Sequence, residues 1–206
     1  MKEESLLNDE YFMRKALQQA EMAFDEEEIP IGAIVVHDNK IIGKGYNQTE
    51  KLVDVTAHAE MLAITSSEQY LGSKYLNECT LYVTIEPCVM CAGAIQWARF
   101  GKVVFGAEEP KSGYRRRSNE LISSKTEVVH GVLKEECAEL MKKFFLTLFF
   151  FSFSHSVLAE QYKIVCDEFK HYESIYALDE TSFYSDLAKY KDREFIIDLK
   201  NNIIHG

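Results

Sequence analysis

The stretch CTLYVTIEPCVMCAGAIQWARFGKVVF, residues 79–105, decides the fold. The β-branched and aromatic residues from Cys79 to Ile85 predict a strand. A predicted helix follows from Cys88 to Phe100, and the apolar run from Lys102 to Phe105 predicts a short buried strand. A strand, a helix and a further strand in succession are typical of an α/β sheet that is covered by helices.

The flanking sequence extends this pattern in both directions. Apolar residues at steps of three and four predict an amphipathic helix from Asn8 to Glu26. The acidic run Glu26-Glu27-Glu28 and Pro30 end it, and we expect the acidic run to be a solvated face. The other predicted elements are a hairpin of residues 31–36 and 40–46, a helix over 57–69, a strand over 127–130 and a helix over 133–145. Together they predict an α/β fold of three layers, α/β/α, with a mixed sheet of about five strands and helices on both faces.

Composition restricts the class of protein. The 206 residues are 47% hydrophobic and 27% charged, which is typical of a soluble globular chain and argues against wholesale disorder. The net charge of −10 disfavours non-specific phosphate binding, so any contact with nucleic acid requires a local basic patch. Five cysteines, an odd number, do not make a secreted disulfide framework. Residues 1–5 carry no signal peptide, and we expect a cytoplasmic protein.

Two short motifs carry the chemistry. The first is Thr56-Ala57-His58-Ala59-Glu60, at the start of a predicted helix, and the second is Glu86-Pro87-Cys88-Val89-Met90-Cys91, between a strand and a helix. Pro87 suits the first helical turn, and the spacing of the two cysteines places both thiols on one face of that turn. The N-terminus of a helix favours thiolates, which are the form of cysteine that binds metal.

One histidine and two cysteines are a ligand set for zinc that leaves one coordination position open. Zinc in such a site lowers the pKa of a water to about 7. Glu60, two residues beyond His58, would face that water and move its proton to a ring nitrogen and a leaving amine, which describes hydrolytic deamination. The cysteine pair alone also allows a redox pair, buried cysteines without a role, or half of a structural zinc site that Cys79 or Cys137 completes.

From about Tyr11 to Phe145 the chain resembles the bacterial tRNA-specific adenosine deaminases of the cytidine-deaminase-like superfamily. The matching segments are IPIGA at 29–33, GYN at 45–47, TAHAEM at 56–61, LYVTIEPCVMCAGA at 81–94, VVFGA at 103–107 and GVL at 131–133. The resemblance implies a cytidine-deaminase-like fold and conversion of adenosine to inosine at the tRNA wobble position by a homodimer. The runner-up within the enzyme class is a deaminase of free guanine or cytosine bases or nucleosides with the same zinc chemistry.

The resemblance also implies roles for individual residues. His58, Cys88 and Cys91 would ligate one Zn²⁺ per subunit, and Glu60 would be the catalytic proton carrier. Asn47 and the backbone around Ala59 would hold the substrate base, although Asn47 alone suggests only a turn residue. The partner would be the anticodon loop of a tRNA, with no membrane partner for the deaminase domain.

A basic loop is the candidate RNA contact in this acidic chain. Lys111 and the run Arg115-Arg116-Arg117 are suited to gripping an RNA backbone, and Tyr114 to stacking on a base. The alternative is a solvated loop without a partner.

The composition changes near residue 141, and we predict a deaminase domain over 1–146 and a C-terminal extension of unknown role over 147–206. From Met141 the sequence has the layout of a secretory signal peptide, with a basic start, a Phe-rich middle and a small residue, Ala159, yet it lies inside the chain. The extension is therefore a segment that packs on the domain, a fusion of two reading frames, or a membrane-touching tail. We hypothesise the fusion.

Overall fold

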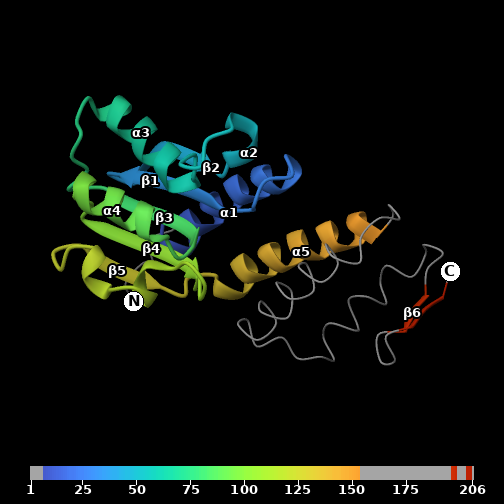
Figure 1. Cartoon of the computed structure of the whole chain (residues 1–206). Coiled ribbons are helices and arrows are strands. Elements are labelled where there is room, and N and C mark those ends of the chain that lie inside the picture. The colour runs from blue at the N-terminus through green and yellow to red at the C-terminus, as the bar shows by residue number, and fades with distance from the viewer. Residues whose placement is uncertain (1–6, 154–195, 199–202, 206) are drawn as a thin grey trace, which may run out of the picture. The chain divides into compact units, whose positions relative to one another are not determined.

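A mixed sheet of five strands organises the chain. The computed structural model describes residues 7–153, 196–198 and 203–205, and the chain divides into two compact units, residues 1–157 and 158–206. The strands of the first unit are β1 (Gly32–His37), β2 (Lys40–Tyr46), β3 (Thr80–Ile85), β4 (Lys102–Ala107) and β5 (Glu127–His130) (Figure 1). Their order is β2-β1-β3-β4-β5; β1 is antiparallel to β2 and β3, whereas β4 is parallel to β3 and β5. The predicted mixed sheet is confirmed.

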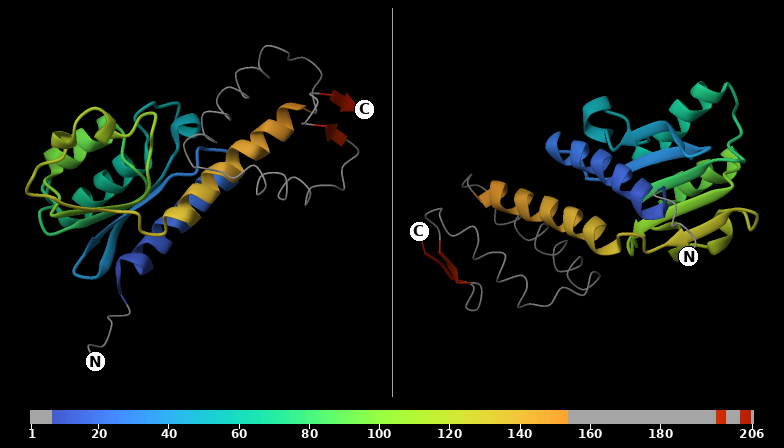
Figure 2. Two further views of the ribbon diagram at one scale, coloured as in Figure 1. Left: turned by 90° about the horizontal axis from the view of Figure 1, so that it is seen from below. Right: turned by 180° about the vertical axis from the view of Figure 1, so that it is seen from behind.

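Helices cover both faces of this sheet, so the predicted three-layer arrangement is confirmed as well. Helices α1 (Asp9–Asp25) and α5 (Lys134–Phe153) lie on one face, and α3 (Ala59–Leu71) and α4 (Val89–Ala98) on the other (Figure 2). The core between the sheet and α3 and α4 includes the fully buried side chains of Ile95 and Phe105. The short elements are α2 (Thr49–Leu52) and the 3₁₀ turns η1 (Tyr114–Arg116) and η2 (Asn119–Leu121).

Two glycines let helices approach the hairpin more closely than any larger residue allows. A Cβ atom on Gly32 of β1 would collide with the carbonyl oxygen of Ala16 in α1. A Cβ atom on Gly45 of β2 would likewise collide with the carbonyl oxygen of Ala59, the first residue of α3. The second contact brings the start of α3 against the end of β2, where the candidate site lies.

Helix α5 runs from Lys134 to Phe153, past both the predicted helix end at 145 and the predicted domain boundary at 146. Where the deaminase domain ends stays a prediction.

The second unit contains an antiparallel pair, β6 (Ile196–Asp198) and β7 (Ile203–His205). Residues 154–195, on which the hypothesis of fused reading frames depends, lie outside the described residues. Among the described residues, no helix combines the length and the apolar character needed to cross a bilayer.

Candidate metal centre and active site

The two chemical motifs meet at the starts of two neighbouring helices. His58 is the N-cap of α3 and Cys88 the N-cap of α4, both with extended backbone, and Cys91 lies in the first turn of α4. The Nδ1 atom of His58 is 3.6 Å from Sγ of Cys88 and 3.5 Å from Sγ of Cys91. Helix α4 begins at Val89, so Pro87 precedes its cap and does not lie in its first turn as predicted.

These distances fit a zinc ion. Zinc lies about 2.1 Å from a histidine nitrogen and about 2.3 Å from a thiolate sulfur, so a tetrahedral site holds the two ligand atoms about 3.6 Å apart. The observed separations of 3.6 and 3.5 Å agree with that value. Among the residues that the structure describes, this is the one group of His, Cys, Asp and Glu side chains with metal-ligand spacing, and it has three members. The donor set therefore fits zinc and leaves the fourth position open.

The two cysteines differ in their readiness to lose a proton. A hydrogen bond from Cys91 lowers the pKa of Cys88 to about 4, and the same hydrogen bond raises the pKa of Cys91. The hydrogen bond with Cys88 also raises the pKa of His58. Cys79 and Cys137 are 2% and 1% exposed and stand apart from this group, so they are small buried residues and do not complete a structural zinc site.

Glu60 lies in the first turn of α3, two residues beyond His58, and only 3% of it is exposed. Burial raises its pKa to about 7, because the charged carboxylate loses its hydration, and the charge of Cys88 adds to this effect. A carboxyl group with a pKa near 7 can both accept and return a proton at neutral pH. That property is suited to a proton carrier beside an activated water.

The segment that carries Asn47, just after β2, is tied to the residue before His58. The backbone N–H of Gln48 donates to the carbonyl oxygen of Ala57 at 3.0 Å, and Ala59 is fully buried. Asn47 is 3% exposed, and its Nδ2 atom donates to Glu28 Oε2 at 2.9 Å. Asn47 and Ala59 thus lie one and two residues from this backbone contact, on two different segments of the chain.

Glu28 was missed by the sequence analysis. The prediction that the acidic run is a solvated face is wrong for this residue, which is 1% exposed. Glu26, by contrast, is partly exposed and pairs with Lys51 at 2.9 Å. The partners of Glu28 come from residues 47–51, far along the chain, so the local charge pattern gave no signal of its burial.

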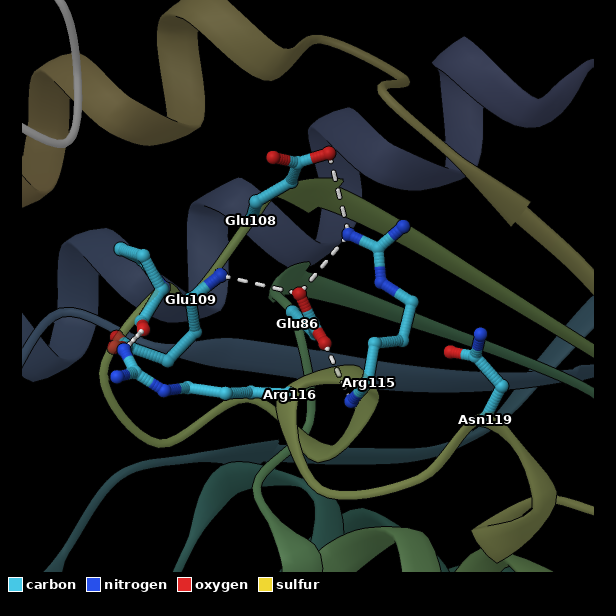
Figure 3. Close-up of a pocket in the computed structure, with 7 residues that line it drawn as sticks. Glu86, Glu108, Glu109, Arg115, Arg116 and Asn119 are labelled. Carbon is cyan, nitrogen blue, oxygen red and sulfur yellow. Dashed lines mark hydrogen bonds and ion pairs between the residues drawn. The ribbon is translucent and has the colours of Figure 1, made fainter.

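The basic loop that follows β4 is fastened by a buried carboxylate. Oε1 of Glu86 accepts from the backbone N–H of Arg115 at 3.0 Å, and Oε2 accepts from Arg115 Nη2 at 3.0 Å and from the backbone N–H of Glu109 at 3.3 Å (Figure 3). The guanidinium of Arg115 also lies over the ring of Phe105, 4.9 Å from its centroid. Arg115 is therefore held inside the loop by ion pairing and packing.

The remaining loop residues divide into buried and exposed ones. Tyr114 is 3% exposed, so its ring has no open face for the stacking on a base that the sequence suggested. Lys111, Arg116 and Arg117 are exposed. A cavity of about 540 Å³ opens beside them, and it is lined by Glu86, Glu108, Glu109, Pro110, Arg115, Arg116 and Asn119 (Figure 3).

Comparison with known proteins agrees with this geometry. Residues 7–107 match the cytidine and deoxycytidylate deaminase zinc-binding region. The chain is 42% identical over 146 residues to a tRNA-specific adenosine deaminase of Streptococcus pyogenes serotype M18, covering 68% of this chain and 92% of the relative. A solved structure from a study of A-to-I editing by tRNA:A34 deaminases at the wobble position is 40% identical with a TM-score of 0.59, covering 63% of this chain and 98% of its own.

A guanine deaminase from Nitrosomonas europaea shares the fold, with a TM-score of 0.60 at 22% identity over 66% of this chain and 83% of its own. Its lower identity contrasts with the 42% and 40% found for the tRNA deaminases, of which the chain covers nearly the whole length. The chain belongs to the family of the tRNA-specific adenosine deaminases, within the zinc-binding cytidine and deoxycytidylate deaminases.

Proposed function

We propose that this chain hydrolyses adenosine to inosine at the wobble position of tRNA and releases ammonia. The observation that carries the proposal is the meeting of a His, Cys, Cys donor set with the buried carboxylate of Glu60 at the starts of α3 and α4. The identity of 42% to a protein named for this activity supports the tRNA substrate.

In this proposal His58, Cys88 and Cys91 hold one Zn²⁺ per subunit. The chemistry supplied by the bound ion is the activation of a water for attack at neutral pH. Glu60 would move both protons of the attacking water, one to the ring nitrogen and the other to the leaving amine, so that adenosine and water become inosine and ammonia. Its burial excludes bulk water from this exchange.

In this proposal the base is bound by Asn47 and by the backbone at Ala59, next to the zinc ligands. The target base is flipped out of the RNA into such a pocket, at low cost for an unstacked loop nucleotide. Lys111, Arg116 and Arg117, the exposed basic residues of the loop after β4, contact the RNA backbone. Tyr114 and Arg115 do not contact the RNA; they pack and hydrogen-bond within the protein and so fix the conformation of that loop.

We also propose that the protein is a homodimer. Val89, Gly93 and Trp97 follow one another at steps of four along α4 and form an apolar stripe, with Val89 43% and Trp97 83% exposed. Substitution Trp97→Glu is expected to shift the protein to monomers in sedimentation velocity, with Lys40→Glu as the control. A chain that sediments as a monomer before the substitution contradicts the proposal.

We assign the deaminase activity to residues 1–146 and expect the protein in the cytoplasm. A fluorescent fusion of the whole chain that follows a soluble cytoplasmic marker on fractionation supports this location. Recovery with the membrane fraction contradicts it.

The test of the function is inosine formation by zinc-loaded protein on an anticodon stem-loop with adenosine at the wobble position. Free adenosine, guanine and cytosine are incubated in parallel. Glu60→Gln is the inactive variant, and Glu68→Gln, at the other end of the same helix, is its matched control. We expect inosine in the stem-loop with the wild type and with Glu68→Gln, and none with Glu60→Gln. Turnover of a free base with the stem-loop untouched overturns the tRNA substrate and keeps the zinc chemistry.

A further inference from the structure

A buried carboxylate lies behind the residue that we propose to hold the base. Glu28 belongs to the loop between α1 and β1 and is 1% exposed, and its carboxylate accepts hydrogen bonds from Asn47, which follows β2, and from Thr49 and Lys51 in α2. Its Oε2 atom accepts from Asn47 Nδ2 at 2.9 Å and from Thr49 Oγ1 at 3.3 Å, and its Oε1 atom accepts from the backbone N–H of Lys51 at 2.8 Å.

An ionised carboxylate only accepts hydrogen bonds, and this decides how the amide of Asn47 is turned. The Nδ2 atom must face Glu28, since the amide oxygen placed there would meet another acceptor. The second Nδ2 hydrogen is directed to Thr49 Oγ1 at 3.1 Å. With both hydrogens engaged inside the protein, the group that Asn47 has left for a ligand is its oxygen, an acceptor.

Burying a charged group in this way is costly unless hydrogen bonds compensate it. The three donors to Glu28 supply that compensation, and all come from the segment that carries Asn47. We infer that Glu28 is a positioning residue, which fixes the orientation of the Asn47 amide so that its oxygen is presented to the substrate base. The inference rests on the proposed function of Asn47 and extends it to a residue that does not itself touch the substrate.

The first test is kinetic and uses Glu28→Gln, which keeps the shape of the side chain but can donate as well as accept. Without a fixed acceptor the Asn47 side-chain amide can flip and exchange the positions of its oxygen and nitrogen. We therefore expect the single-turnover rate on the stem-loop to fall by about 10- to 100-fold. The KM is expected to stay within about twofold, because the contacts to the RNA backbone are unchanged. Glu27→Gln, the exposed neighbour, is the matched control and should behave as the wild type.

A double-mutant cycle separates positioning from general structural damage. Once Asn47→Ala has removed the amide, Glu28→Gln should cost less than about twofold more, because its effect runs through Asn47. Thr49→Val, which removes the second acceptor for Nδ2 together with one donor to Glu28, should cost several-fold and remains measurable if Glu28→Gln folds poorly. Full additivity of Glu28→Gln and Asn47→Ala, or wild-type rate in Glu28→Gln with its zinc retained, overturns the inference.

A second measurement, hydrogen exchange of the Asn47 side-chain amide, does not depend on enzyme activity. It therefore distinguishes a failure of this inference from a failure of the proposed function. The side-chain NH₂ signals of Asn47, identified by their loss in Asn47→Ala, should be protected from hydrogen exchange in the wild type and exchange at least tenfold faster in Glu28→Gln. Equal exchange in both proteins overturns the positioning role even where stem-loop turnover succeeds. Protection without stem-loop turnover leaves the amide fixed as inferred and overturns the tRNA substrate instead.

Discussion

Arg115 and Glu86 form an ion pair whose carboxylate is almost fully buried. The Nη2 atom of Arg115 lies 3.0 Å from Glu86 Oε2, and the side chain of Glu86 is 4% exposed. The same Nη2 atom lies 3.2 Å from Oε1 of Glu108, whose side chain is 52% exposed. One guanidinium group therefore has an exposed carboxylate partner in its own loop and a buried one, Glu86, which lies two residues before the candidate zinc ligand Cys88 in the sequence.

This arrangement predicts unequal costs for two chemically identical substitutions. Glu86→Gln should lower the free energy of unfolding by about 2–3 kcal/mol, because it removes the buried negative charge that pairs with the Arg115 guanidinium. Glu108→Gln should cost less than about 1 kcal/mol, as exposed ion pairs do. Urea denaturation of the zinc-loaded variants measures both values. Equal losses would show that burial does not set the strength of the pair.

The zinc ligands could be predicted because they lie in two short motifs in which the functional residues are only two or three positions apart. Cys88 and Cys91 lie within one helical turn, and His58 and Glu60 begin another helix, so local sequence contains most of the geometry. The helices and strands and the three layers that they form were predictable for a similar reason, since each helix and strand has its own period of apolar residues.

The inward-facing charges could not be predicted in that way. Glu28 is one of three consecutive glutamates and Arg115 one of three consecutive arginines, and nothing local distinguishes them from their neighbours. Their burial is decided by partners 19 to 29 residues distant, such as Asn47 for the first and Glu86 for the second. Tertiary contacts of that range override the charge pattern, which by itself describes a solvated face.

Removal of zinc should expose one thiol of the centre to alkylation. With the metal chelated, Cys88, which is partly exposed, is expected to react with iodoacetamide at pH 8 first among the four cysteines between residues 79 and 137. Cys79 and Cys137 should stay unmodified in the folded protein, since burial raises their pKa values to about 11 and about 12.

Peptide mass spectrometry identifies the modified residue, and added zinc should protect it. Labelling of Cys88 at the same rate with and without zinc would contradict its assignment as a ligand.

The stability of the metal-free protein should depend on pH through Glu60. Its folded pKa of about 7 lies above the ordinary value of 4.5, so the folded state holds the proton more tightly than the unfolded state. The protonated Glu60 side chain therefore contributes its full share to the free energy of unfolding below about pH 4.5, and this contribution is lost as the pH rises through about 7.

Glu60→Gln does not titrate, so relative to the wild type it should gain stability between pH 5 and pH 8, by on the order of 3 kcal/mol at most. Urea denaturation of both metal-free proteins at the two pH values gives this difference. A difference that shrinks as the pH rises would contradict the predicted sign.

The exposed arginines of the basic loop should control the salt dependence of RNA binding. Each phosphate contact that is lost should reduce the slope of log K against log salt concentration by about 0.7 for single-stranded RNA. Arg116→Gln and Arg117→Gln are therefore expected to flatten the slope, as measured by fluorescence anisotropy of the stem-loop between low and moderate salt. Lys40→Gln is the control, because Lys40 pairs with His37 at the opposite end of the hairpin from Asn47. An affinity of the wild type that does not change with salt would rule out the backbone contact.

A chain that ends at Val157, the last residue of the first compact unit, should keep the deaminase activity. Because the whole sheet, its covering helices and the metal centre precede that residue, we expect kcat/KM on the stem-loop within about twofold of the full chain. A chain that ends at His130 is the contrasting variant. It lacks α5, whose Met141 and Phe144 are 1% and 6% exposed, and should lose several kcal/mol of stability, about 2–5 for each large apolar side chain removed. Loss of activity in the Val157 chain at unchanged melting temperature and zinc content would instead assign residues 158–206 a part in binding the tRNA.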